Sequence, residues 1–247
     1  QVTARVVRDA ARILTVSEWS KADIVARFGA DPARITVFYN GIHPDFLAGA
    51  PPGAAQAARA RFASGRPYLF AIGAPLPRKN TASMLRALGV LHARRPLDHL
   101  VLVSGLSEAQ RAPFAAAAGE AGIADRVRFL PYLERADLVA LFAGADLSIY
   151  PSLVEGWGIP VIESLSQGTP VVTSRTSGMA EAGGEHAFYF DPTDVESMAA
   201  GIARALDERD RFAAVRDAAI ARARTFTWRR AAEVTLDVYR AACAEAR

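Results

Sequence analysis

Short apolar runs alternate with longer segments of helical spacing through most of this chain. The runs, rich in β-branched and aromatic residues, predict six strands at residues 68–72, 100–104, 127–130, 147–150, 170–173 and 187–190. The segments between and after them predict helices at residues 80–95, 108–121, 135–144, 159–167 and 195–206. Several strands are apolar at nearly every position, as in a parallel sheet covered on both faces. The pattern therefore predicts an α/β fold with a Rossmann-like, doubly wound parallel sheet of about six strands.

The start of the chain follows a different pattern. Residues 12–16 and 35–39 predict strands, with a helix from Ser17 to Phe28 between them, and Asn40-Gly41 predicts a turn. This arrangement is typical of the end of another domain. Residues 49–64 are rich in Ala, Gly and Pro and predict a linker or a loosely held helix.

The end of the chain predicts a long amphipathic helix over residues 227–246, in the manner of a docking helix. Its large apolar residues on or near one stripe are Trp228, Val234, Leu236, Val238 and Tyr239. We therefore expect three parts, at residues 1–48, 49–226 and 227–247.

Composition narrows the class of protein. The chain has 247 residues, of which 51% are hydrophobic, so it can bury a substantial core. It has no run of about 18 uncharged apolar residues and no signal-peptide pattern in residues 1–12, so we expect a cytoplasmic protein. The net charge of +3 is compatible with a diphosphate ligand or with peripheral contact at the inner face of a membrane, and it gives little support for nucleic acid. The single cysteine, Cys243, excludes an internal disulfide, and the four histidines lack metal-ligand spacing, so we expect no metal.

The strongest chemical signal lies in residues 150–172, which predict a strand, a glycine turn, a helix and a second strand. Gly156 and Gly158 allow close approach of the backbone to a ligand, and the following helix N-terminus favours a phosphate or a sugar hydroxyl. Glu155 and Glu163 lie eight positions apart and can both face the crevice above the strand ends. A single glutamate is more often a solvated surface acid, but the surrounding motif favours a binding role.

A basic loop follows the first strand of the predicted sheet. It runs from Gly73 to Arg78, Lys79 and Asn80, and its two adjacent cations could neutralise a diphosphate at the carboxyl end of a parallel strand. A solvated loop is the ordinary alternative. A dehydrogenase is disfavoured, because the Gly-x-Gly of residues 156–158 is only half of a dinucleotide fingerprint.

These segments resemble the large family 4 of retaining glycosyltransferases, called group 1 in older naming. The resemblance rests on Arg78-Lys79-Asn80, Pro151-Ser152, Glu155-Gly-Trp-Gly158, the spacing to Glu163, and Gly168-Thr-Pro-Val-Val172. It extends to residues 15–21 and 37–42, to Glu181 and to Phe190-Asp-Pro192, and so covers nearly the whole chain. It implies a GT-B fold, with residues 49–226 as its carboxyl-terminal, nucleotide-sugar-binding domain and residues 1–48 as a remnant of the acceptor-side domain.

The resemblance also implies roles for single residues. Arg78 and Lys79 are expected to hold the donor diphosphate and to stabilise the leaving group without a metal ion. Glu155 is expected to contact the transferred sugar, so its replacement should matter only when the sugar is present. Glu163 is expected to accept hydrogen bonds from the ribose hydroxyls.

Other matched positions complete the expected substrate site. They are Gly73, the backbone of Gly156, Trp157 and Gly158, Ile159 at the helix start, and Tyr132 near the nucleobase. Pro131-Tyr132 is equally compatible with an ordinary strand-end turn that carries an aromatic plug. Arg78, Lys79 and Glu155 are the expected catalytic residues.

We therefore expect transfer of a hexose from a nucleoside-diphosphate sugar to a carbohydrate or lipid-linked acceptor, with retention at the anomeric carbon and no further cofactor. The loop at residues 77–80 and the Phe190-Asp-Pro192 ending are similar to mannosyltransferase-like members of polysaccharide and lipopolysaccharide biosynthesis, which favours GDP-mannose over UDP-glucose. Alternatives are a GT-B epimerase or phosphorylase, and a non-catalytic sugar-nucleotide-binding module.

The family's amino-terminal domain supplies acceptor recognition, and the resemblance places at most residues 1 to about 45 within it. The start at Gln1 also suggests missing sequence. We therefore expect the isolated chain to bind the donor without transferring sugar, and to self-associate through apolar surface at both ends.

Overall fold

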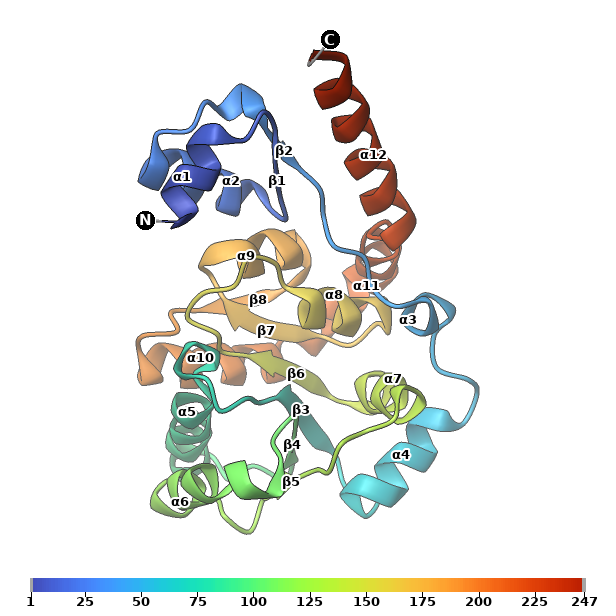
Figure 1. Ribbon diagram of the computed structural model, residues 1–247. Helices are drawn as coiled ribbons and strands as arrows, with labels where there is room; N and C mark the ends of the chain where they lie inside the picture. Colours follow the sequence, from blue (N-terminus) through green and yellow to red (C-terminus); the bar gives the residue numbers. More distant parts are fainter. Residues whose placement is uncertain (1, 246–247) are drawn as a thin grey trace.

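A six-stranded parallel sheet forms the centre of the computed structural model, which describes residues 2–245 (Figure 1). Its strands are β3 (Tyr68–Ile72), β4 (Leu100–Ser104), β5 (Val127–Phe129), β6 (Leu147–Tyr150), β7 (Val171–Ser174) and β8 (Phe188–Phe190). Their order in the sheet is β5-β4-β3-β6-β7-β8, and every pair is parallel. The predicted α/β fold is confirmed, and each predicted strand is present to within a residue or two at either end.

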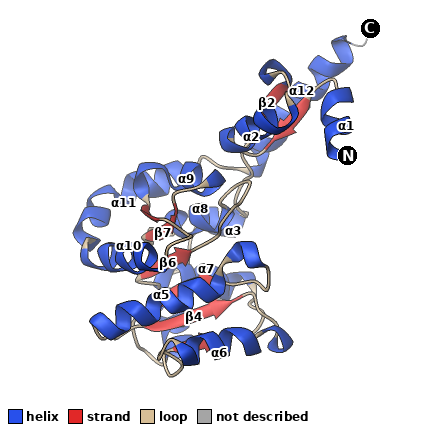
Figure 2. Cartoon of the chain, turned by 90° about the vertical axis from the view of Figure 1, so that its left-hand side faces the viewer, coloured by secondary structure: helices blue, strands red, loops and turns tan. Residues whose placement is uncertain are grey.

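Helices cover both faces of this sheet (Figures 1 and 2). They are α5 (Thr81–Arg94), α6 (Ala112–Glu120), α7 (Arg135–Gly144), α8 (Ile159–Ser166), α9 (Ser177–Gly183), α10 (Val195–Asp207) and α11 (Arg209–Ala223). Short 3-10 turns are η2 (Pro77–Lys79), η3 (Glu108–Gln110) and η4 (Gly184–His186). The predicted helix at 108–121 is divided into η3 and α6 because Pro113, which lacks an amide donor, lies in the first turn of α6. The pattern did not predict α9 or α11.

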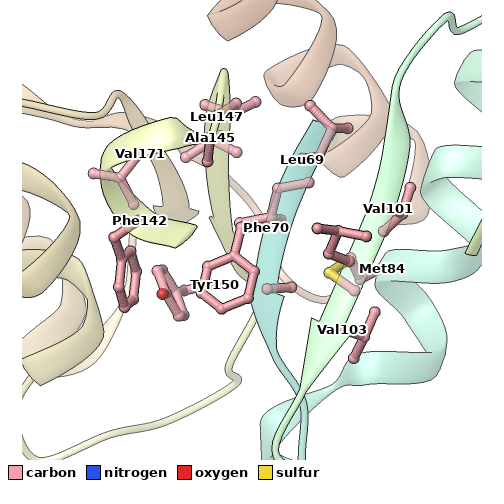
Figure 3. Close-up of a cluster of buried hydrophobic side chains, with 14 of the residues drawn as sticks. Leu69, Phe70, Met84, Val101, Val103, Phe142, Ala145, Leu147, Tyr150 and Val171 are labelled. Carbon is pink, nitrogen blue, oxygen red and sulfur yellow. The ribbon is translucent and has the colours of Figure 1, made fainter. Parts of the chain in front are cut away.

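The core lies between the central strands and these helices. Leu69 and Phe70 of β3 are completely buried, and Phe70 meets Phe142 of α7 edge to face at 5.0 Å between ring centres (Figure 3). Consecutive residues of β3 are buried because their side chains point to opposite faces and helices cover both. Tyr68 adds a polar anchor, since its hydroxyl donates to the Leu141 carbonyl at 2.7 Å.

Helix α4 (Ala54–Ala63) corrects the prediction of a linker or loosely held helix at residues 49–64. Ala58, Phe62 and Ala63 are buried, and α4 packs on α7. Arg59 also donates to the Gly144 carbonyl at 2.8 Å. The small side chains that suggested a flexible linker instead allow the two helices to approach each other closely.

The start of the chain forms a small unit with its own core. It contains α1 (Val2–Asp9), β1 (Ile13–Thr15), α2 (Glu18–Phe28), η1 (Pro32–Arg34) and β2 (Ile35–Val37). β1 and β2 pair in parallel as a separate two-stranded sheet, and Val7, Ala30 and Ile35 are buried together. Both strands are shorter than predicted, and α1 was not predicted. Ser17 caps α2 as expected, accepting from the Ser20 amide.

Two segments cross each other at the edge of the main sheet domain. Residues 38–42 lead into α3 (Pro44–Ala48), and residues 225–227 lead into α12 (Trp228–Glu245). They lie side by side, because a Cβ on Gly41 would be 2.1 Å from the Trp228 amide nitrogen. Glycine is therefore required at that crossing.

The terminal helix α12 buries one narrow stripe and exposes much apolar surface. Ala231 is buried, whereas Trp228, Leu236 and Tyr239 are each at least half exposed. Gln1 and the last two residues, Ala246 and Arg247, lie outside the described residues, and with them the outer ends of the predicted parts 1–48 and 227–247. Within residues 2–245, no helix is both long and apolar enough to cross a membrane. Self-association stays a prediction.

Candidate functional site

The candidate site lies where the strand order of the main sheet changes direction. β3 and β6 are neighbours, with Leu69 opposite Leu147, and the chain continues outward from them in opposite directions through β4 and β7. Loops that follow two such central strands diverge and leave a crevice at their carboxyl ends. The basic loop follows β3 and the glycine turn follows β6, so the topology brings the two predicted motifs together.

The two motifs meet through ion pairs. Arg78 donates from Nη1 to Oε2 of Glu155 at 2.5 Å, and Nζ of Lys79 lies 2.8 Å from Oε1 of the same carboxylate. The Glu155 side chain is only 13% exposed, whereas Arg78 remains 46% exposed. The predicted catalytic residues are therefore adjacent, with the carboxylate occupying an anion position between two cations. This pairing changes the expectation that Glu155 matters only when a sugar is bound.

Backbone and amide contacts hold the two loops in register. The Leu153 amide donates to the Arg78 carbonyl at 2.7 Å. Asn80 donates from Nδ2 to the carbonyls of Pro151 and Pro192, at 3.1 and 2.8 Å. Its φ of 55° places it in the left-handed region, which asparagine tolerates better than most residues. Asn80 therefore joins three loops, a role that the sequence motif contained but did not reveal.

The glycines of the turn at residues 156–158 lie close to other segments of the chain. A Cβ on Gly156 would lie 3.1 Å from Val16, and one on Gly158 would lie 2.8 Å from Ala182. Trp157 is only 7% exposed and packs against Tyr39 and Phe226, with ring centres 4.8 and 5.1 Å away. Only the backbone of this residue is therefore available to a sugar. Close approach of the chain's own segments explains these residues without any ligand.

Helix α8 follows the turn and places the second carboxylate deep in the domain. Ile159 begins α8 and is half-buried, while Glu163 is 9% exposed and its carboxylate has no hydrogen-bonding partner within residues 2–245. Burial raises the pKa of Glu163 to about 7, opposed in part by the charge of Arg135. The hydroxyl of buried Tyr150 lies in the same environment, and its pKa is raised well above its ordinary value by burial and then by Glu163. With a pKa of about 7, Glu163 is present in both protonated and ionised forms at neutral pH.

A cavity of about 430 Å³ opens beside the ends of β3 and β4. Its lining includes Ser104, Gly105, Tyr132 and Arg135. Tyr132 is 91% exposed, which contradicts the alternative of an aromatic plug, since a plug would be buried. Gly73 passes close by, because a Cβ on Gly105 would lie 2.6 Å from its carbonyl oxygen.

The structure therefore joins Arg78, Lys79 and Glu155 directly, and it places Tyr132 and Arg135 on one cavity. Arg135 was not predicted, and neither were the hydroxyl side chains of Thr173, Ser174, Thr176 and Ser177, which bond to the glycine-turn segment. A run of hydroxyl residues directly after a predicted strand was the available signal.

Comparison with protein families shows what the chain is related to. A family model described as glycosyl transferases group 1 matches residues 54–225, which is more than half of the chain. The chain belongs to this family. A second model, described as Glycosyltransferase Family 4, matches residues 1–46.

Curated relatives carry glycosyltransferase names. The chain is 27% identical to O-antigen chain mannosyltransferase B of Escherichia coli, over 92% of this chain and 60% of the relative. It is 34% identical to D-inositol 3-phosphate glycosyltransferase of Acidothermus cellulolyticus, over 99% of this chain and 56% of the relative. The chain therefore spans between half and two thirds of the length of these proteins.

Solved structures share the fold. Sucrose-phosphate synthase of Thermosynechococcus elongatus superposes with a TM-score of 0.84 at 21% identity, over 99% of this chain and 61% of that one. The Anabaena protein Alr3699/HepE, solved with UDP and glucose, superposes with a TM-score of 0.80 at 21% identity, over 98% of this chain and 66% of that one. The predicted GT-B fold is confirmed.

Proposed function

We propose that this chain is the donor-binding part of a retaining glycosyltransferase, which moves a hexose from a nucleoside-diphosphate sugar to a carbohydrate or lipid-linked acceptor. Arg78 and Lys79 bind the diphosphate and stabilise it as the leaving group. Glu155 and the backbone of residues 156–158 orient the sugar. Catalysis then depends mainly on positioning and on leaving-group electrostatics.

The observation that carries this proposal is the carboxylate between the two cations. Glu155 places its oxygens within 2.8 Å of both Arg78 and Lys79. Two cations that converge on one pair of oxygens are arranged for a phosphate group as well, because phosphate presents similar oxygens with more charge. No metal ion is then needed to neutralise the leaving group.

The cavity beside β3 and β4 and the buried Glu163 support the nucleoside part of the proposal. The cavity beside Tyr132 and Ser104 supplies room for a base, and Glu163 supplies an acceptor for ribose hydroxyls. A ribose that donates to Glu163 would give this buried carboxylate a hydrogen-bonding partner.

We favour mannose as the hexose and GDP-mannose as the donor. The names of two relatives, the Escherichia coli mannosyltransferase and a Mycolicibacterium hassiacum MMP alpha-(1->4)-mannosyltransferase at 30% identity, support this choice. A UDP-sugar is the alternative supported by the Anabaena neighbour, which was solved with UDP-glucose. Parallel titrations with GDP-mannose and UDP-glucose separate the two.

The test is calorimetric titration of the chain with GDP and UDP, in EDTA and then in Mg²⁺. Replacing both Arg78 and Lys79 by Ala removes charge-assisted hydrogen bonds of about 1.5–3 kcal/mol each before solvent screening. Because Arg78 is half exposed, we expect a total loss of roughly 100-fold in diphosphate affinity and little change for the nucleoside. EDTA should leave the parent affinity unchanged.

Arg94 and Arg95 provide the matched control. They are also adjacent cations, paired with Glu196 and Asp207 at 2.6 Å each, but they lie at the far end of α5. Replacing both by Ala should not change nucleotide affinity. If the Arg78/Lys79 variant binds the diphosphate as tightly as the parent without metal, the proposed leaving-group site is wrong.

We expect residues 1–247 alone to transfer sugar at a negligible rate. The chain spans only 56–60% of the compared relatives, and the contacts proposed for it are with the donor and not with an acceptor. Joining the chain to a complete acceptor-side domain should restore transfer. Binding of the donor without transfer, even in the longer protein, would instead support a sugar-nucleotide-binding module.

A further inference from the structure

A row of hydroxyl side chains attaches the glycine-turn segment to the neighbouring strand. The residues come from the end of β7 and the start of α9, and each bonds to a different backbone group of residues 150–155. The bonds run from Thr173 to the Tyr150 carbonyl at 2.9 Å, from Ser174 to Ser152 at 2.6 Å and from Thr176 to Leu153 at 3.2 Å, and the Glu155 amide donates to Ser177 Oγ at 3.1 Å. The row ends at Glu155, the residue that pairs with both cations.

Ser177 differs from the other three hydroxyl residues in its backbone. Its φ of 59° lies in the left-handed region, where a side chain other than glycine is unfavourable, and it is only 5% exposed. Such strain at a non-glycine residue persists when surrounding structure requires it, and it is concentrated at functional sites. The next residue, Gly178, donates from its amide to the Glu155 carbonyl at 3.0 Å. The two residues therefore hold both polar backbone groups of Glu155.

A fixed backbone at Glu155 restricts the position of its carboxylate. The carboxylate is held by ion pairs with Arg78 and Lys79. A diphosphate that takes over both cations would release that carboxylate, and the fixed backbone of Glu155 would then help to restrict where its oxygens can lie. A carboxylate that must accept hydrogen bonds from a sugar needs this limit, because a mobile side chain loses conformational entropy on binding.

We propose that Ser177 is a positioning residue for Glu155: its hydroxyl, held by a strained backbone, fixes the Glu155 amide so that the released carboxylate meets the donor sugar. The inference rests on the proposed donor function of the crevice. Glycine at this position would relieve the strain but would remove the acceptor, so the presence of serine is explained by the hydrogen bond.

The experiment compares Ser177→Gly and Ser177→Ala with Ser64→Gly in the 247-residue chain. Ser64 is a matched control because it also has a positive φ, of 52°, and also accepts a hydrogen bond, from Arg128 at 3.0 Å. It ends α4, ahead of the amino end of β3, whereas Ser177 follows the carboxyl end of β7 (Figure 1). Ser177→Gly removes strain and acceptor together, and Ser177→Ala removes the acceptor alone.

Two readouts are measured: exchange of the Glu155 amide hydrogen by NMR, and the ratio of affinities for a nucleotide sugar and its nucleoside diphosphate. The probes are GDP-mannose with GDP and UDP-glucose with UDP. Both Ser177 variants should speed Glu155 exchange roughly three- to tenfold and reduce the affinity ratio by a similar factor, with diphosphate affinity unchanged. Ser177→Gly should be the more stable of the two, because only it relieves the strain. Ser64→Gly should change neither readout.

Unchanged exchange in both Ser177 variants overturns the proposal, because the hydroxyl then does not hold the amide. Faster exchange with an unchanged affinity ratio also overturns it, since the contact is then only structural. If the parent binds neither diphosphate, the proposed donor function fails separately. An equal affinity of the parent for diphosphate and nucleotide sugar overturns the positioning role, because there is then no sugar contact to position.

Discussion

Glu155 and Glu163 belong to one short segment of the chain, yet the structure places them in opposite environments. Glu155 lies at the crevice surface between Arg78 and Lys79, whereas Glu163 is buried in α8. The carboxylate of Glu163 has no hydrogen-bonding partner within residues 2–245, and burial raises its pKa to about 7. One carboxylate is therefore neutralised by charge, and the other by its tendency to keep a proton.

In the proposed function, the two environments would serve two ends of one ligand. Arg78 and Lys79 would supply positive charge for a diphosphate. Glu163, which is buried and has a pKa raised to about 7, would suit a neutral sugar ring that donates hydrogen bonds. Substitutions at Glu155, Glu163 and Tyr132 test this division.

Replacing Glu163 by Gln should stabilise the protein at high pH. The folded pKa of about 7 lies above the ordinary 4.5, so the unfolded chain loses this proton first as the pH rises. The parent therefore loses up to about 3 kcal/mol of unfolding free energy between pH 4.5 and pH 8, and Glu163→Gln should not lose it. Denaturant unfolding at both pH values measures the difference. Glu155→Gln is the control: it keeps Glu163 and should therefore keep the same loss of unfolding free energy between the two pH values.

Binding of a nucleoside diphosphate should strengthen as the pH rises from 6 to 8. A ribose hydroxyl that donates to Glu163 favours the ionised carboxylate. Because the pKa of Glu163 in the free protein is about 7, binding near neutral pH should release a proton from this group. The expected gain is about tenfold, and proton release should appear as a buffer-dependent heat of binding. Glu163→Gln should remove the pH dependence of affinity, except for the component that arises from protonation of the ligand's own phosphate. An unchanged pH profile in the variant would show that the ribose does not use Glu163.

Replacing Glu155 by Gln should strengthen binding of a nucleoside diphosphate without sugar. The carboxylate competes with the ligand for Arg78 and Lys79, and the neutral amide competes less. We expect an increase of roughly three- to tenfold in diphosphate affinity by calorimetry, and a smaller increase or a loss for the nucleotide sugar. Weaker binding of the diphosphate alone would contradict the competition and would assign Glu155 a direct role in the phosphate site.

Replacing Tyr132 by Ala should have the smallest effect. The side chain is 91% exposed, so the unfolding free energy should change by less than about 0.5 kcal/mol. Loss of an aromatic contact with the base should weaken nucleoside and diphosphate binding alike, by about 1 kcal/mol or less. An unchanged nucleoside affinity would remove Tyr132 from the site and would leave the cavity to Ser104 and Arg135.

Much of the architecture follows from the sequence alone. Six strands could be predicted because a buried parallel strand must be apolar on both faces, and this constraint is local and periodic. The two loops of the site could be predicted because glycines and adjacent cations at strand ends are also local patterns. Their meeting at β3 and β6 followed from the family resemblance and from the way parallel sheets are connected.

Contacts between distant segments decided the rest. The burial of Trp157 by Tyr39 and Phe226, and the close packing of α4 on α7, depend on neighbours far away in the chain. The same is true of Ser177, whose strained backbone is meaningful only beside the Glu155 amide. A local sequence pattern predicts which positions are buried or lie in turns. Which residues contact each other from distant parts of the chain depends on how the helices pack on the sheet. For that reason the sequence determined which loops carry the charged and glycine motifs, and only the tertiary structure decided which of their side chains meet and which are buried.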